Sequence, residues 1–190
     1  MNPITHALTG WCLAEAVPNT THREKALITF AAMAPDLDGF GIFAELATRN
    51  TDTPLLWWTD YHHQLCHNLP FAALLALLAA AIARGHRLRA ATLVFVAVHL
   101  HLIGDLAGSR GPDGYQWPIP YLFPFTKSVQ LVWSGQWALN AWPNIALTVV
   151  LLAATAVLAW SRGESIVGLI SRRADRAFVA ALRARVPRRA

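Results

Sequence analysis

Histidine and aspartate side chains recur in this chain at spacings that suit metal binding. His101 and Asp105 are four residues apart within an apolar stretch, so on a helix both project from one face and can reach one divalent ion. His63 and His67 have the same spacing, which two zinc ligands on one helical face also use. His62 and His67 are five residues apart and would converge if a turn intervened. Ionisable groups inside apolar segments are costly, which favours a functional role for them.

Two further parts of the chain add candidate ligands. Pro35-Asp36-Leu37-Asp38-Gly39 carries two carboxylates at an expected helix break, and His6 lies near the start of the first apolar segment. An Asp-x-Asp pair alone is a weak signal, and this one lacks the rest of a calcium loop, including its distant glutamate. The choice between His62 and His63 stays open. The predicted ligands are His6, Asp36, Asp38, His62, His63, His67, His101 and Asp105.

The types of ligand restrict the metal and its chemistry. Mixed imidazole and carboxylate groups favour zinc, with manganese or iron as alternatives. The candidates exceed the three or four ligands of one catalytic zinc, so either two ions bind or some residues only orient the ligands. Two ions could clamp the attacking and leaving oxygens of a phosphoester. Asp36 or Asp38 would serve as general base or bridging ligand. For Cys66, a small apolar filler is favoured over a thiol nucleophile.

The segments that must position these residues have the composition of a membrane protein. Of 190 residues, 55% are hydrophobic and 14% are charged, whereas an average soluble domain has about 25% charged residues. A bilayer core needs about 20 helical residues. We therefore expect an all-α, polytopic membrane helix bundle with four or five hydrophobic segments. They are residues 5–17, 26–43, 69–83, 93–106 and 141–160.

The basic residues are distributed unevenly. Thirteen of the sixteen fall in three parts of the chain that alternate to lie on one side of the bundle: Arg23 with Lys25, the stretch 84–89, and the tail from Arg162 onward. The positive-inside rule places this side, with the C-terminus, in the cytoplasm. We therefore expect a multi-pass protein of the bacterial inner membrane with its metal site on the periplasmic side.

The chain divides into a membrane-embedded, hydrolase-like domain, residues 1–160, and a basic cytoplasmic tail, residues 161–190. Apolar residues in the tail have helical spacing, which predicts an amphipathic helix on the inner membrane surface. Eight of the sixteen basic residues lie in this tail, so we expect contact with anionic lipid and no binding of nucleic acid. In residues 108–140, an expected cap over the site, Arg110 and Lys127 are candidates for binding an anionic substrate group.

Several of these motifs together resemble the YdjM-like family of inner-membrane metal-dependent hydrolases, a LexA-regulated family built on a domain of unknown function. The resemblance covers roughly residues 2–125, and it implies a membrane-embedded hydrolase with a metal site. Two positions depart from the family pattern: His63 stands where the family has arginine, and Cys66 where it has threonine. The matching elements are Asn2-Pro3-Ile4-Thr5-His6, Ala34-Pro35-Asp36-Leu37-Asp38-Gly39, His62 to Asn68, His101-Leu102-Ile103-Gly104-Asp105, and Gly114 to Pro124.

The function we expect is that of a membrane-bound metal-dependent hydrolase acting on a phosphoester or lipid-linked substrate. The competing hypothesis is a non-catalytic metal-binding membrane protein: a transporter, a sensor or a structural protein with a metal staple. A transporter should carry ionisable groups along both halves of its helices, whereas residues 69–83 and 141–160 carry none, which favours the enzyme. The sequence predicts no particular oligomeric state.

Overall fold

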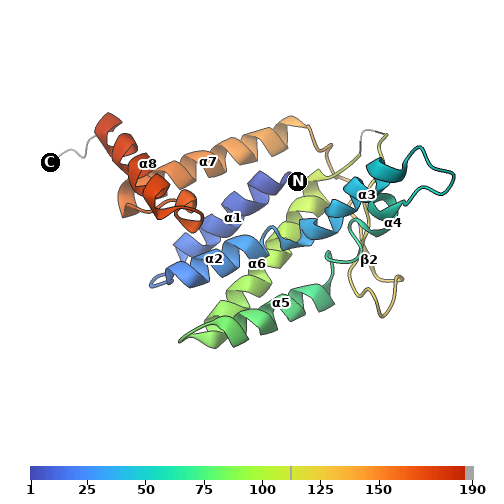
Figure 1. The fold of residues 1–190 in the computed structure, drawn as a ribbon, viewed down its shortest axis with the longest axis horizontal. Coiled ribbons are helices and arrows are strands. Elements are labelled where there is room, and N and C mark those ends of the chain that lie inside the picture. Colours follow the sequence, from blue (N-terminus) through green and yellow to red (C-terminus); the bar gives the residue numbers. More distant parts are fainter. Residues whose placement is uncertain (112, 187–190) are drawn as a thin grey trace.

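A computed structural model describes residues 1–111 and 113–186 of the chain (Figure 1). It is mostly helical, which confirms the predicted all-α class. Residue 112 of the expected cap and residues 187–190 of the basic tail lie outside the described residues. The helical elements are α1 (Pro3–Ala16), α2 (His22–Ala31), the 3₁₀ helix η1 (Ala34–Phe40), α3 (Gly41–Thr48), α4 (Trp57–Tyr61), α5 (Leu69–Ile82), α6 (Arg87–Gly108), α7 (Trp142–Arg162), the 3₁₀ helix η2 (Ile166–Leu169) and α8 (Arg172–Arg185).

The expected cap over the site is mostly irregular. In its described part, β1 (Ile119–Pro120) and β2 (Gln130–Leu131) form a two-stranded antiparallel sheet, with Ile119 opposite Leu131. Asn144, at the start of α7, holds the end of the cap against the bundle. The side-chain amide of Asn144 donates to the carbonyl of Gly108 at the end of α6, at 2.8 Å. The cap is therefore tied to the same end of α6 that carries Asp105.

Side-chain caps begin four of the described helices, α1, α2, α5 and α8. Asn2 accepts a hydrogen bond from the backbone N–H of Thr5 at 2.9 Å, and Asn68 starts α5 in the same way. Thr21 and Glu24 form a reciprocal capping box at the start of α2. The two asparagine caps hold the positions around His6 and His67, which explains why asparagine stands next to both motifs.

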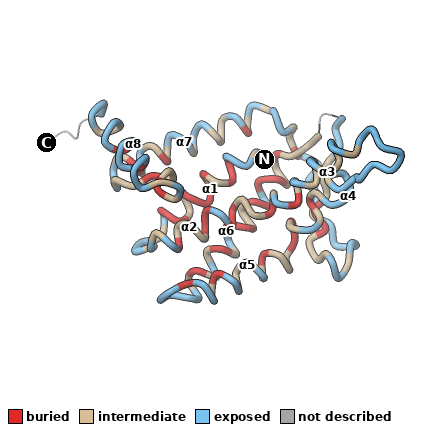
Figure 2. Tube along the Cα trace, in the orientation of Figure 1, coloured by how far each residue is buried: buried red, intermediate tan, exposed pale blue. Residues whose placement is uncertain are grey.

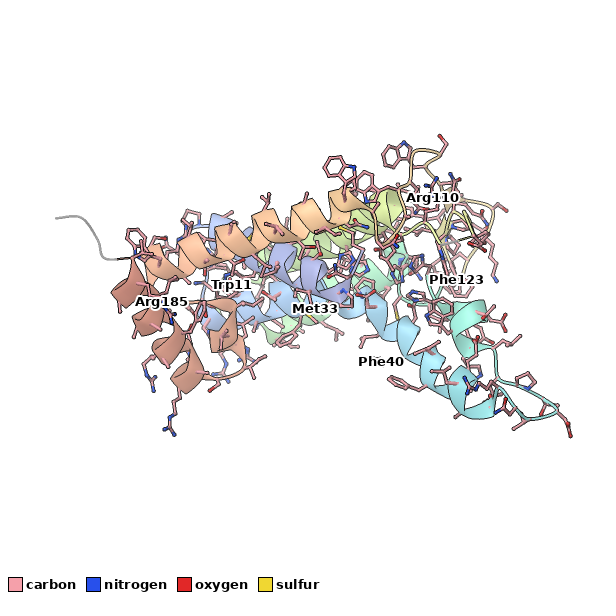
Figure 3. The ribbon with its side chains drawn as sticks, turned by 90° about the horizontal axis from the view of Figure 1, so that it is seen from above. Trp11, Met33, Phe40, Arg110, Phe123 and Arg185 are labelled. Carbon is pink, nitrogen blue, oxygen red and sulfur yellow. The ribbon has the colours of Figure 1, made fainter. Side chains whose placement is uncertain are left out.

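A break after α2 redirects the chain. Pro35 has no backbone N–H, and the N–H of Asp36 bonds to the carbonyl of Met33 at 3.1 Å rather than to that of Ala32. The carbonyl of Ala32 is therefore free for a partner on another helix. The two arms, α2 and η1 with α3, meet at an angle of 46°. In Figure 3, Met33 lies at this bend and Phe40 on the arm beyond it.

Small residues allow the helices to approach closely. At Gly10 of α1, a Cβ atom would lie 2.6 Å from the Cβ of Ala32, so only glycine fits there. α6 runs through the bundle and packs against α1, α2 and α5, and Figure 2 shows most buried positions along these helices. The core is mainly alanine and β-branched residues: Ala14, Ile28, Ala31, Ala32, Ala72, Ala79, Val94, Ala97 and Val98.

The number of membrane spans is smaller than the sequence suggested. α6, with 22 residues, and α7, with 21, are long and apolar enough to cross a bilayer, and the bent pair α2 with η1–α3 would make a third span. α1 and α5 have 14 residues each, which is about 21 Å of helix against a hydrocarbon core of about 30 Å. The described helices therefore give two or three candidate spans, and four or five is not confirmed, because α1 and α5 are short.

The two ends of the bundle differ in character. α8 lies at one end, and α3, α4 and β2 lie at the other (Figure 1). α8 is the helix predicted for the basic tail. Its Arg172, Arg173 and Arg176 are exposed, while Asp175 is buried and accepts hydrogen bonds from the backbone N–H and the hydroxyl of Ser165, at 2.8 and 2.6 Å.

An ionic network joins α1, α2 and α7 near the α8 end. Buried Glu15 contacts Lys25 at 2.5 Å and Arg162 at 2.6 Å. Glu164 contacts Lys25 at 2.9 Å and His22 at 3.1 Å. Burial raises the pKa of Glu164, but the hydrogen bonds from Lys25 and His22 outweigh it and lower this pKa below its usual value. The carboxylate of Glu164 therefore stabilises the folded state while it is charged.

Candidate metal centre

Four of the predicted ligands meet at one point of the bundle: Asp36, His67, His101 and Asp105. One ligand atom from each lies within 4.8 Å of the others. They come from η1, from the turn before α5, and from α6. The side chain of Asp36 is 22% exposed, whereas those of the other three are fully or almost fully buried. Asp36 is therefore the member of the cluster whose side chain lies partly at the surface.

The contacts within the cluster are short. The Nε2 atom of His101 lies 2.9 Å from the Oδ2 atom of Asp105, as their spacing on one helical face predicts. The Nε2 atom of His67 lies 3.3 Å from the same oxygen and 3.1 Å from the Nε2 atom of His101. Asp36 is slightly farther, with its Oδ1 atom 3.7 Å from the Nε2 atom of His101. Two imidazoles and two carboxylates thus converge, and this donor set suits zinc.

The outer nitrogen of each imidazole has an acceptor that fixes its tautomer. The Nδ1 atom of His101 lies 2.7 Å from the carbonyl oxygen of Ala32. A carbonyl oxygen only accepts, so this nitrogen carries a proton. The Nδ1 atom of His67 donates in the same way to the Oδ2 atom of Asp38, at 3.0 Å. Metal-binding histidines are oriented by such partners. In the neutral rings, both Nε2 atoms therefore present lone pairs to the same point.

This convergence of acceptors requires a positive charge. Among residues 1–111 and 113–186, the buried Oδ2 atom of Asp36 has no hydrogen-bond partner, and the buried Oδ2 atom of Asp105 faces the Nε2 atoms of His67 and His101. Burial lowers the pKa of His67, but its hydrogen bonds to Asp105 and Asp38 outweigh burial and raise the pKa to about 9. The cluster is therefore stabilised by a proton on His67 or by a cation that replaces the proton.

Asp38 orients side chains around the cluster. Its Oδ1 atom accepts from the Nδ1 atom of His62 at 2.8 Å, and its Oδ2 atom accepts from His67 and from the backbone N–H of Cys66, at 3.0 and 3.1 Å. Both oxygens are thus occupied, and Asp38 is not one of the four clustered residues. A 3₁₀ helix has three residues per turn, so Asp36 and Asp38, two residues apart, point in different directions.

The turn before α5 corrects one prediction. His63 and His67 were expected on one helical face, but the chain is not helical there: His62 has an extended backbone, and His63 has a φ angle of 67°. Such a positive φ is uncommon for a residue other than glycine. The turn lets His62 and His67 both reach Asp38, as predicted for a turn between them. The buried ring of His63 packs against His67 and Trp117, with ring centroids 4.4 and 4.9 Å apart.

His6 supports the cluster from α1. Its ring stacks on that of His101 with centroids 3.6 Å apart, and its Nε2 atom lies 3.1 Å from the Oδ1 atom of Asp105. The hydroxyl of neighbouring Thr5 contacts that of Thr148 on α7 at 2.6 Å. α1 and α7 are thereby linked next to the site, and His6 lies beside the four clustered residues rather than among them.

Sequence reasoning missed several partners of Asp105. The hydroxyl of Ser109 donates to the Oδ1 atom of Asp105 at 2.9 Å, and the α-amino group of Met1 contacts the same oxygen. The side-chain amide of Gln136 donates to the backbone carbonyl of Asp105 at 2.8 Å. Ser109 follows Asp105 by four residues, a spacing that could have revealed it. Met1 and Gln136 come from distant parts of the chain and carry no such signal.

Cys66 lies beside the site but does not have the properties of a nucleophile. Burial and the charge of Asp38 raise the pKa of its thiol to about 11. At neutral pH the thiol is therefore protonated, whereas the thiolate is the nucleophilic form. This favours the interpretation of Cys66 as a small filler.

A cleft of about 440 Å³ lies next to the cluster. His62 belongs to its wall and is hydrogen-bonded to Asp38, so a single side chain separates the cleft from the residues that hold His67. Lys127, one of the two predicted substrate-binding residues, lines the cleft. Arg110 does not: it lies in the cap (Figure 3), where its backbone N–H bonds to the carbonyl of Trp137 at 3.1 Å.

Comparison with known families identifies the chain. The model of the YdjM inner membrane protein family matches residues 1–176. The chain belongs to this family. No curated protein and no solved structure matched it. Membership confirms the resemblance drawn from the sequence motifs, and with the apolar helices α6 and α7 it supports a membrane protein that carries a candidate metal centre.

Proposed function

We propose that the protein is a membrane-bound, metal-dependent hydrolase that acts on a phosphoester or lipid-linked substrate. One observation carries this proposal. The Nε2 atoms of His67 and His101 and an oxygen of Asp105 point to one place, and the outer nitrogen of each ring is fixed by an acceptor. Such an arrangement leaves lone pairs with no donor between them, which suits a divalent ion.

His67, His101 and Asp105 would hold the ion, with Asp36 on the open side. Zinc fits this donor set best, and manganese or iron are alternatives. When bound, the ion supplies Lewis acidity and makes water a stronger nucleophile at neutral pH. Four clustered residues suit one ion, with His6, Asp38 and His62 in supporting positions.

Asp36 is the best placed general base. Its Oδ2 atom has no hydrogen-bond partner among the described residues, and its side chain is partly exposed beside the cluster. It can therefore accept a proton from a water molecule that attacks the substrate. Asp38 is less suited to this role, because both of its oxygens already accept hydrogen bonds. It holds the imidazoles of His62 and His67 instead.

Turnover of defined substrates would test the proposal. Protein purified in detergent is loaded with zinc or manganese and assayed on a phospholipid, a lipid pyrophosphate and a generic phosphodiester. Wild type should hydrolyse at least one of them, and the double variant Asp36→Asn with His101→Ala should be inactive. Thermal unfolding shows whether that variant still folds. If folded variant and wild type are equally inert on the whole panel, phosphoester hydrolysis is the wrong function.

A closed, non-catalytic metal site is the second candidate, in a metal-stapled structural protein, a sensor or a transporter. It is favoured by the burial of His67, His101 and Asp105, since four ligands complete a structural zinc site. Cobalt-substituted protein separates the two candidates. Added inorganic phosphate should change the visible absorption of cobalt in an open site, whereas a closed site gives the same spectrum with and without phosphate.

A further inference from the structure

We propose that the cleft beside the metal centre binds a sugar phosphate, so that the lipid-linked substrate carries a glycosyl phosphate as its head group. The inference rests on the proposed function for its role in turnover. Binding itself depends only on the cleft. The side chains that line this cleft, and those that are missing from its lining, indicate the chemistry of the ligand.

Aromatic rings form part of the cleft. The rings of Trp58 and Trp117 meet edge to face with centroids 5.1 Å apart, and Tyr115 approaches Trp117 at 5.9 Å. Trp58 comes from α4, whereas Tyr115 and Trp117 come from the cap, so two separate segments build this wall. A flat indole matches the apolar C–H face of a pyranose ring, and aromatic walls with a few polar groups are typical of small-molecule sites.

Polar side chains complete the lining. Gln64, Gln130 and Thr59 border the cleft. A primary amide offers both a donor and an acceptor, as does each hydroxyl group of a sugar. An acyl chain bound here would remove these amides from water without replacing their hydrogen bonds, which is unfavourable. The lining therefore favours a hydroxylated ligand over a lipid tail.

The charge of the cleft favours an anionic group on the same ligand. Lys127 contributes its ammonium group, which lies 5.5 Å from the ring centre of Phe123. Among the described residues that line the cleft, Lys127 carries the formal charge, while the carboxylates of Glu45 and Asp38 lie behind the lining, bonded to Thr59 and His62. An ammonium group is a strong point donor to phosphate oxygens. A sugar phosphate matches both the aromatic wall and this cation.

The cleft also lies where a head group would meet the metal centre. His62 belongs to its wall, with its ring 5.5 Å from that of Trp117, and it bonds to Asp38. Asp38 in turn holds His67 of the cluster. A sugar on Trp117 would thus lie beside His62, which Asp38 links to His67 of the cluster, and its phosphate would be held by Lys127 within the cleft.

Calorimetric titration of the full chain in detergent tests the inference. The probes are glucose 1-phosphate, galactose 1-phosphate and N-acetylglucosamine 1-phosphate, compared with glycerol 3-phosphate and inorganic phosphate. The Asp36→Asn variant serves as host, because the proposed hydrolysis needs that carboxylate and binding in the cleft does not. At least one sugar phosphate should bind ten times more tightly than glycerol 3-phosphate.

Variants locate the binding. Trp117→Leu should weaken sugar phosphate binding at least tenfold and leave inorganic phosphate unchanged, while Lys127→Gln should weaken both. Trp142→Leu, an exposed indole at the start of α7, is the matched control and should change neither. Equal binding of all five probes, or equal effects of the two tryptophan variants, would overturn the inference. Neither result would bear on the hydrolysis panel. Conversely, tight sugar phosphate binding without turnover of any substrate would reject the proposed function alone.

Discussion

Replacement of Asp38 tests whether this residue orients the metal ligands or is a ligand itself. We compare Asp38→Asn and Asp38→Ala with Asp105→Ala, which removes a predicted ligand. Asp60→Asn is the matched control, because its carboxylate is exposed on α4 and lies outside the cluster. If Asp38 only fixes the tautomer of His67, its loss should weaken metal binding without abolishing it.

The structure gives the size of the effect. Asparagine keeps one oxygen, which can still accept from His67, but its amide group would face the Nδ1–H of His62 and the negative charge is lost. Alanine leaves both imidazoles without an acceptor. Loss of such outer partners typically costs 10- to 100-fold in metal affinity, or about 1.4 to 2.7 kcal/mol. We therefore expect zinc affinity to fall about tenfold in Asp38→Asn and about 100-fold in Asp38→Ala.

Competition with a fluorescent zinc chelator measures these affinities in detergent, and elemental analysis gives the metal content. Thermal unfolding of the metal-free forms controls for misfolding. Asp105→Ala should retain almost no metal. Two results would refute the reasoning: zinc affinity in both Asp38 variants equal to that of Asp60→Asn, or loss of metal from them as complete as from Asp105→Ala. The second result would make Asp38 a direct ligand.

Three further predictions test the fold and its orientation. Gly10→Ala places a methyl group 2.6 Å from the Cβ of Ala32, so it should cost about 1–3 kcal/mol of stability and lower zinc affinity, whereas Ala16→Val at an exposed position should do neither. Glu164→Gln should lower the melting temperature at pH 7. Because the folded pKa of Glu164 is depressed, this difference should shrink as the pH falls below about 4 and be lost below the folded pKa. A reporter that fluoresces only in the cytoplasm should be bright when fused after Ala190; a dark fusion would reverse the predicted topology.

The part of the site that lies on one regular helix could be predicted from the sequence. His101 and Asp105 meet because residues four apart on α6 share a face, and the Asn-Pro start of α1 places His6 in its first turn. Family motifs supplied the rest of the candidate set. The motifs could not show which residues bind the metal and which only orient a ligand. The two kinds are often the same amino acid, as Asp36 and Asp38 are.

The parts that depend on irregular backbone could not be predicted. The spacing of His63 and His67 suggested a helical face, but a positive φ at His63 turns the chain and directs His62 to Asp38 instead. Hydropathy marked α1 and α5 as possible spans, although each is only 14 residues long. An apolar segment can be buried in protein or in lipid. Its helix must also be about 20 residues long to cross the bilayer, and hydropathy does not give this length.

The bundle tolerates the helix break at Pro35 because the freed backbone finds hydrogen-bond partners on neighbouring elements. Non-helical backbone at membrane depth leaves carbonyl groups that need partners, and it persists only where protein or a cavity supplies them. Here the freed carbonyl of Ala32 accepts from His101 at 2.7 Å. The 3₁₀ turn that follows sends Asp36 toward the cluster and Asp38 toward His67. One ligand and both groups that fix the imidazole tautomers therefore come from seven consecutive residues, 32–38. A continuous helix would keep the Ala32 carbonyl in its own hydrogen-bond ladder and could not orient His101.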